Sequence, residues 1–226
     1  MRMCLVFDFD GVIINSHNLQ MKALEESYRK VVGKGEPPYK EFFLNSGDSL
    51  NNIFKKINLP LEMISEYIKV STENTHMILL HEGVKELLSE LIEKGHKCAL
   101  CTGKDRERTL YILELLKLNC FFKSVVCSDD VMFPKPHPES LLKSIENLNG
   151  DIYNSVMIGD GINDILCAKK AGVMSIAVTW GDTSIDEVIQ AEPDAVSDTM
   201  QELGEQIEQI YVDLRETSHG KNLCRP

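Results

Sequence analysis

The stretch Arg2-Met-Cys-Leu-Val-Phe-Asp8-Phe-Asp10-Gly11 decides the fold of this chain of 226 residues. Its apolar residues run without interruption instead of alternating with polar ones, which is typical of a strand buried on both faces in a parallel sheet. We expect this strand to span Arg2 to Phe9 and to stop at Asp10-Gly11. Asp8 and Asp10 are two residues apart, so their side chains point the same way from an extended strand.

Strand and helix patterns alternate regularly beyond residue 83. Apolar runs predict strands at 97–102, 124–128, 155–159, 174–178 and 195–196. Helical spacing predicts helices at 84–93, 106–117, 139–148, 164–171 and from 200 to about 214. This alternation indicates an α/β fold: a doubly wound parallel sheet with helices on both faces.

A helical pattern fills the interval between the first two strands. Apolar residues recur there at a spacing of three to four, as in Leu50, Ile53, Phe54 and Ile57. We therefore predict a core formed by residues 1–15 and 81–216 and an inserted α-helical module over 16–80. Residues 217–226 have no periodicity and include Gly and Pro, so we expect a flexible tail.

Composition argues against several classes of partner. Lys and Arg total 24 against 35 Asp and Glu, and a formal net charge of -11 does not suit binding to nucleic acid or to an anionic membrane. The N-terminal apolar run is too short for a signal peptide or a membrane span, so we expect a cytoplasmic protein. The 7 Cys residues show no repeated zinc-site spacing and suit reduced thiols. For the oligomeric state we expect a monomer or a weak homo-oligomer.

Acidic residues follow two of the predicted strands. Asp8 and Asp10 end the first, and Asp160 and Asp164 follow the strand at 155–159. An isolated Asp-x-Asp-Gly is also typical of a turn, and Asp164 alone could cap the next helix. Carboxylates that converge at the carboxyl edge of a parallel sheet raise one another's pKa unless a divalent cation keeps them ionised. Oxygen ligands without His or Cys favour Mg²⁺ over zinc.

Thr102 and Lys135 can supply a hydroxyl group and a positive charge beside these acids. The hydroxyl of Thr102 and the backbone N–H groups of Gly103 and Lys104, at an expected helix entry, can cradle a phosphoryl group. Lys135 lies between two prolines, which hold its backbone extended. Alone it would be a solvated lysine in a surface loop. Beside the acids, its charge can balance both a nucleophile and a phosphate.

Four segments, in this order, resemble the signature of the haloacid dehalogenase superfamily, a group dominated by phosphatases. They are Asp8-Phe-Asp10-Gly, Thr102, Lys135 in Lys-Pro-His-Pro, and Gly-Asp160-Gly-Ile-Asn-Asp164. The resemblance implies a Rossmann-like core, and the insert is similar to the small helical cap of the phosphoglycolate phosphatase and beta-phosphoglucomutase branch. Asn15 departs from the pattern, since relatives commonly have Asp there, and we expect this to affect cap hinge contacts more than chemistry.

The resemblance also implies a mechanism. Asp8 would attack phosphorus and form an aspartyl phosphate, while Asp10 would protonate the leaving oxygen and later activate water. Thr102 and Lys135 would hold phosphoryl oxygens.

The resemblance implies a metal site as well. Mg²⁺ would be held by Asp8, the backbone carbonyl of Asp10, and Asp160, with Asp164 as a ligand or just behind the ligands. The expected partner is a small phosphorylated metabolite: phosphoglycolate, a sugar phosphate or a biosynthetic intermediate.

Two alternatives stay open at this point. A phosphomutase of the beta-phosphoglucomutase type would keep the whole residue set and return the phosphoryl group to a sugar. A receiver-like signalling module also combines acids, Thr and Lys with magnesium, but it would carry its phospho-accepting Asp on a later strand and would have no cap. In the insert, residues 17–18 and 45–48 are candidates for substrate contact, although Ser46 or Asp48 could equally cap the following helix.

Overall fold

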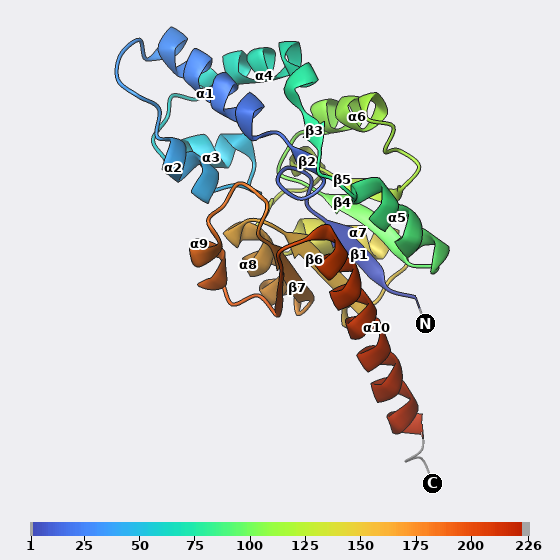
Figure 1. Ribbon diagram of the computed structural model, residues 1–226. Helices are drawn as coiled ribbons and strands as arrows, with labels where there is room; N and C mark the ends of the chain where they lie inside the picture. The colour runs from blue at the N-terminus through green and yellow to red at the C-terminus, as the bar shows by residue number, and fades with distance from the viewer. Residues whose placement is uncertain (1, 223–226) are drawn as a thin grey trace.

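A parallel sheet of six strands forms the centre of residues 2–222, the part of the chain that this computed structural model describes (Figure 1). The strand order is β5-β4-β1-β6-β7-β8. The strands are β1 (Cys4–Phe7), β4 (Lys97–Cys101), β5 (Phe122–Val126), β6 (Ser155–Gly159), β7 (Met174–Val178) and β8 (Ala195–Ser197). All four residues of β1 are buried, as expected for an uninterrupted apolar run in the middle of a parallel sheet.

Helices cover both faces of the sheet. One face carries α5 (Val84–Glu93), α6 (Arg106–Leu115) and α10 (Met200–Asn222), whose apolar residues share one cluster with β1. The other face carries α7 (Glu139–Asn147) and α8 (Ile162–Ala171). A short helix that was not predicted, α9 (Ile185–Ile189), packs on α8 through Val188. Single 3₁₀ turns lie at Thr75–Met77, Ser128–Asp130 and Ile152–Asn154. The predicted doubly wound α/β fold is confirmed.

Four helices form a separate layer beside the carboxyl end of the sheet, which we call the cap (Figure 1). They are α1 (His17–Val31), α2 (Tyr39–Leu44), α3 (Leu50–Lys56) and α4 (Met63–Glu73). They enclose an apolar cluster of their own that includes the rings of Phe42, Phe54 and Tyr67. The helical periodicity over this stretch therefore reflects a core distinct from that of the sheet.

Two short strands connect the cap to the sheet. Strands β2 (Ile14–Asn15) and β3 (Leu79–Leu80) pair antiparallel where the chain enters and leaves the cap. Neither strand was predicted, because two residues are too few to show a period of two. We call this pair the hinge. Asn15 lies in it and accepts a hydrogen bond from the His17 backbone N–H at 3.3 Å.

The last helix is longer than expected. The sequence pattern ended it near Leu214, whereas α10 continues to Asn222, so the predicted flexible tail is helical over 217–222. Extending an existing helix needs no new nucleus, so a helix can continue past the last residue of its apolar pattern. Residues 223–226 of the predicted tail lie outside the described residues. Over residues 2–222, no helix combines the length and the apolar character needed to cross a membrane.

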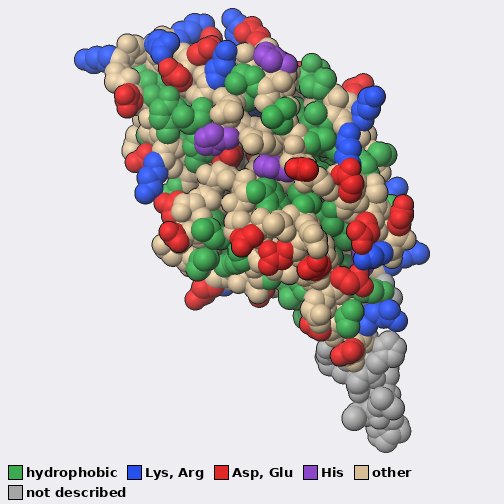
Figure 2. All heavy atoms as spheres, in the orientation of Figure 1, with side chains coloured by type: hydrophobic (Ala, Val, Ile, Leu, Met, Phe, Trp, Pro, Cys, Tyr) green, Lys and Arg blue, Asp and Glu red, His purple; other side chains and the backbone are tan. Residues whose placement is uncertain are grey.

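Charged side chains of both signs are interspersed on the face shown in Figure 2, over the cap and over the sheet domain. This mixture agrees with the excess of acidic residues in the sequence. Partners, oligomeric state and cytoplasmic location stay predictions.

Candidate active site

The predicted site residues meet at the carboxyl edge of the sheet. Asp8 directly follows β1, and its backbone N–H still donates to Ile158 O of β6 at 2.8 Å. Because β1 lies between β4 and β6, the residues after these three strands come together, which places Thr102 and Asp160 beside Asp8. The side chain of Lys135 comes in from the loop before α7 and is 1% exposed.

Lys135 ties two of the acids together. Its Nζ lies 2.6 Å from Asp164 Oδ1 and donates to the Cys101 carbonyl at 2.9 Å. It is also 2.9 Å from Asp8 Oδ1, an ion pair whose angle is not that of a hydrogen bond. Burial alone would lower the pKa of Lys135, but the two carboxylates outweigh it and hold the pKa well above its usual value. Lys135 is therefore a permanent positive charge beside Asp8.

Three carboxylates form a compact buried cluster that fits a divalent cation. Oxygens of Asp8, Asp160 and Asp164 lie within 4.8 Å of one another. Asp8 Oδ1 and Asp160 Oδ1 are buried without a hydrogen-bond partner. Burial and the neighbouring carboxylates raise the pKa of Asp8 to about 7 and that of Asp160 well above its ordinary value. A cation between these oxygens would remove both penalties, and an all-oxygen set suits Mg²⁺.

The four predicted metal residues differ in what their oxygens already bind. Asp164 accepts from Lys135 with one oxygen and from the Gly161 N–H, at 3.1 Å, with the other. Both oxygens of Asp164 therefore already accept a hydrogen bond, whereas one oxygen each of Asp8 and Asp160 accepts none. The carboxylate of Asp10 is not in the cluster, so a metal contact by Asp10 would fall to its backbone carbonyl.

Asp10 faces the entrance of the cap instead. Its Oδ1 accepts a hydrogen bond from Ser16 Oγ at 2.5 Å, and Lys104 Nζ lies 3.2 Å from the same oxygen. Ser16 directly precedes α1, so the carboxylate of Asp10 links the core to the first helix of the cap. The two acids of Asp-x-Asp therefore have different surroundings, one held against a buried lysine and one against the cap.

The segment Thr102 to Lys104 differs in part from the expected phosphate cradle. The Lys104 N–H donates to Thr102 Oγ1 at 3.1 Å, so this amide is already bonded, while the Lys104 side chain turns to Asp10. Gly103 lies against the cap: a Cβ there would be 2.3 Å from the Asp48 carbonyl oxygen. Only glycine lets the cap loop come this close. The side-chain position of Lys104 and the close approach at Gly103 could not be read from spacing.

The cap closes over the site and leaves a cavity of about 50 Å³. Its floor includes Asp8 and Asp10, and the cap contributes apolar side chains such as Phe42 and Tyr67. Arg108, from α6, also lines the cavity. Neither Arg108 nor Tyr67 was among the predicted site residues. A charged residue one helical turn beyond Lys104 was the available signal.

Contacts from the cap loop and from the loop after β7 complete the surroundings. His17 stacks on Phe43, with ring centroids 4.5 Å apart, and its Nδ1 lies 3.0 Å from Asp182 Oδ1. The Asp182 N–H donates to Asp160 Oδ2 at 2.8 Å, so this loop also orients the acid cluster. The residue that caps the N-terminus of helix α3 is Ser49, whose Oγ accepts a hydrogen bond from the Asn52 N–H.

Ser46 and Asp48 were the two residues considered for this helix-capping position, and both have other contacts. Asp48 is buried, and its Oδ2 lies 2.8 Å from Lys56 Nζ. The backbone carbonyl of Ser46 accepts a hydrogen bond from the Asn163 side chain. Both residues are close to Ser49 in sequence, and only the path of the loop decides which of these neighbours caps the helix.

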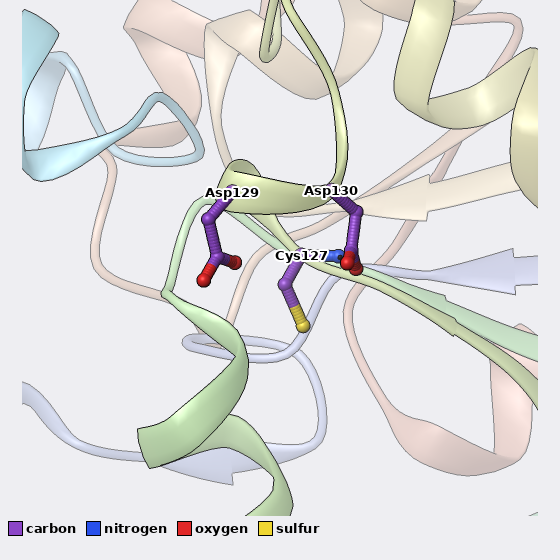
Figure 3. Close-up of side chains that lie close together, drawn as sticks. All are labelled: Cys127, Asp129 and Asp130. Atoms are coloured by element: carbon purple, nitrogen blue, oxygen red, sulfur yellow. Dashed lines mark hydrogen bonds between the residues drawn. The ribbon is translucent and has the colours of Figure 1, made fainter.

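A second acidic cluster shows the contrast with the first. Cys127, Asp129 and Asp130 lie close together at the end of β5 (Figure 3). Asp130 accepts from the Arg106 guanidinium and from the Cys127 N–H, and Asp129 accepts from the Arg106 N–H. Burial would raise the pKa of Asp130, but these hydrogen bonds outweigh it and lower the pKa. Its oxygens are satisfied within the protein, so nothing here calls for a cation.

The haloacid dehalogenase-like hydrolase model matches residues 5–178, which spans the four motif segments. The chain belongs to this family. It is 32% identical to pyrophosphatase PpaX of Bacillus mycoides (strain KBAB4) over 202 residues, covering 88% of this chain and 94% of that one. It is 40% identical to the phosphoglycolate phosphatase of Agrobacterium fabrum over 118 residues, 52% of this chain and 50% of that one. The resemblance drawn from the motifs is confirmed.

Solved structures agree with the fold of this haloacid dehalogenase-like hydrolase. A hydrolase from Pseudomonas syringae superposes with a TM-score of 0.83 at 22% identity, covering 92% of this chain and 99% of that one. A putative beta-phosphoglucomutase from Bacteroides vulgatus gives a TM-score of 0.77 at 18% identity, covering 94% and 90%. The family match and the helical cap do not support the receiver-like alternative.

Proposed function

We propose that this protein is a Mg²⁺-dependent phosphatase that hydrolyses small phosphate monoesters through an aspartyl phosphate on Asp8. The observation that carries the proposal is the carboxylate of Asp8, buried beside Lys135 and Asp160 with one oxygen left without a hydrogen bond. A carboxylate held this way is available as a nucleophile or a metal ligand. The matched relatives named phosphoglycolate phosphatase and pyrophosphatase support phosphoryl transfer.

The residues of the chain divide the reaction between them. Asp8 attacks phosphorus and the bond to the leaving oxygen breaks, while Lys135 balances the charge of the nucleophile and of the phosphoryl group. Asp10 gives its proton to the leaving oxygen, then takes a proton from the water that attacks the aspartyl phosphate and releases Asp8 with inorganic phosphate. Bound Mg²⁺, held by Asp8, Asp160 and the Asp10 carbonyl, would supply screening between carboxylate and phosphate.

The contacts of Asp10 place the proposed proton-exchanging acid where the cap meets the core. Ser16 and Lys104 both contact Asp10 Oδ1, and both lie at the junction of cap and core. Closure of the cap therefore sets the position of the acid at the same time as it excludes water. A cavity of about 50 Å³ holds only a few water molecules, so the closed site accommodates a small substrate.

The test is phosphate release from a panel of small phosphate monoesters, with Mg²⁺ and with EDTA. The parent protein is compared with Asp8→Asn and with Asp129→Asn, an exposed aspartate in the second acidic cluster. We expect Mg²⁺-dependent release that is lost in Asp8→Asn and kept in Asp129→Asn. Activity that persists in Asp8→Asn, or that is unchanged by EDTA, contradicts the proposal.

A further inference from the structure

Two cations line the cavity from the start of α6. They are Lys104, just before the helix, and Arg108, in its first turn, with side chains 8% and 10% exposed. Residues four apart at a helix start lie on one side of it, so both cations line the same wall. Lys104 already contacts Asp10, whereas the proposed reaction gives Arg108 no part.

Arg108 is held so that part of its guanidinium is left unused. Its Nε donates to Asp105 Oδ2 at 2.6 Å, and Asp105 also caps α6 by accepting from the Arg108 N–H at 3.0 Å. Nη1 makes one long contact, 3.4 Å, with Ser71 Oγ of the cap. Nη2 has no hydrogen-bond partner among the side chains and backbone of residues 2–216. Arg108 lines the cavity and its Nη2 is not fully enclosed by protein, so this edge of the guanidinium can meet a ligand, and a planar fork of this kind suits a carboxylate or a phosphoryl group.

The cap side of the cavity combines polar residues, Gln20, Ser46 and Asp48, with a group of apolar side chains next to Arg108. These apolar side chains are Phe42, Leu50, Ile53 and Tyr67, and the Arg108 guanidinium lies 6.0 Å from the centre of the Tyr67 ring. An aromatic face beside a guanidinium keeps it oriented and dry, which strengthens its attraction for an anion. Lys104 sits next to Asp10, which would meet the leaving oxygen, and Arg108 lies one turn further along the helix.

We propose that Arg108, assisted by Lys104, binds a second anionic group carried by the leaving group of the substrate. The substrate class is then a small phosphate ester or anhydride whose leaving group bears a carboxylate or a phosphoryl group a few atoms from the cleaved bond. This inference rests on the proposed phosphatase function and narrows it. Arg108 acts on specificity, while Asp8 and Asp10 carry out the chemistry.

The test compares three substrates of similar size: 2-phosphoglycolate, pyrophosphate and 2-hydroxyethyl phosphate, which has the shape of phosphoglycolate without its carboxylate. We expect the parent to favour one of the two anionic leaving groups, and that choice identifies carboxylate or phosphoryl. Arg108→Gln should lower kcat/KM for the favoured substrate roughly 10- to 100-fold and for 2-hydroxyethyl phosphate less than about 3-fold. Arg108→Lys should restore part of the preference.

The ratio of kcat/KM for two substrates within one variant does not depend on how much of the protein is folded, so a stability effect cannot imitate the result. Arg29→Gln is the matched control, because Arg29 is exposed and pairs with Glu25 on the same helix. An equal loss on all three substrates in Arg108→Gln would mean that Arg108 only holds the cap, and it would overturn the proposal. A parent enzyme without preference for an anionic leaving group would overturn it as well.

Binding in the Asp8→Asn background separates this inference from the proposed function. Calorimetric titration with 2-phosphoglycolate, pyrophosphate and 2-hydroxyethyl phosphate needs no turnover. The subsite is supported if a ligand with an anionic leaving group binds selectively and Arg108→Gln removes that binding. If the parent then hydrolyses nothing, the phosphatase proposal fails and the subsite stands. Equal affinity for ligands whose leaving group is anionic and for 2-hydroxyethyl phosphate, whose leaving group is neutral, overturns the subsite if hydrolysis is intact, and leaves the phosphatase proposal standing.

Discussion

Replacing Asp8 by Asn should stabilise the metal-free protein against unfolding at pH 8, although the same change removes activity. Burial and then the neighbouring Asp164 raise the pKa of Asp8 from 3.8 to about 7, even with Lys135 beside it. In the unfolded chain the pKa returns to its ordinary value. Between about pH 4 and pH 7 the folded protein therefore keeps a proton that the unfolded chain has released, and the free energy of unfolding falls as the pH rises through this window.

The size of the effect follows from these two pKa values. Each tenfold difference in proton affinity corresponds to about 1.4 kcal/mol, so an ionised Asp8 lowers the free energy of unfolding by at most roughly 4 kcal/mol above pH 7. At pH 5 the same reasoning gives an effect less than half as large. Asn has the same shape and does not ionise, so Asp8→Asn should exceed the parent by a margin that grows from pH 5 to pH 7 and then stays constant.

Urea unfolding followed by circular dichroism, in EDTA at pH 5, 6, 7 and 8, measures this margin. Asp130→Asn is the control of opposite sign, because the pKa of Asp130 is lowered by its hydrogen bonds and the ionised form stabilises the fold. That variant should be less stable than the parent at neutral pH. Added Mg²⁺ should stabilise the parent more than Asp8→Asn, since the cation relieves the charge of Asp8. A margin that is negative at pH 8, or that does not change between pH 5 and pH 7, refutes the reasoning.

Two further substitutions test the contacts around the site. Lys135→Met leaves Asp8 and Asp164 without their cation, so kcat should fall by roughly 100- to 1,000-fold in a phosphate-release assay; a loss below about tenfold would show that the lysine does not stabilise the transition state. Gly103→Ala places a methyl group 2.3 Å from the Asp48 carbonyl oxygen, so the cap cannot close fully. We expect KM to rise about tenfold while the thermal midpoint changes little, because the clash lies between cap and core; an unchanged KM would show that the cap need not approach Gly103.

The sequence alone determined the sheet and the position of the acids. The apolar run that ends at Asp8 predicts a strand, because a strand buried on both faces needs an apolar side chain at every position. The same holds for the helices of the core, whose predicted starts at Val84, Arg106 and Glu139 match the structure. The strand order that brings Asp160 next to Asp8 follows from the fold class rather than from any pattern in the residues themselves.

What the tertiary structure alone decided is how the cap sits on the core. The contacts of Lys104 with Asp10, of Gly103 with the Asp48 backbone and of Arg108 with Ser71 join segments separated by many residues along the chain. Helical periodicity shows which face of a helix is apolar, but it says nothing of which loop that helix meets. The pairing of the hinge strands and the position of Arg108 Nη2 likewise depend on how the cap, which has its own apolar core, packs on the sheet domain. Local pattern therefore fixed the position of the acids in the chain, while long-range packing decided which groups surround them.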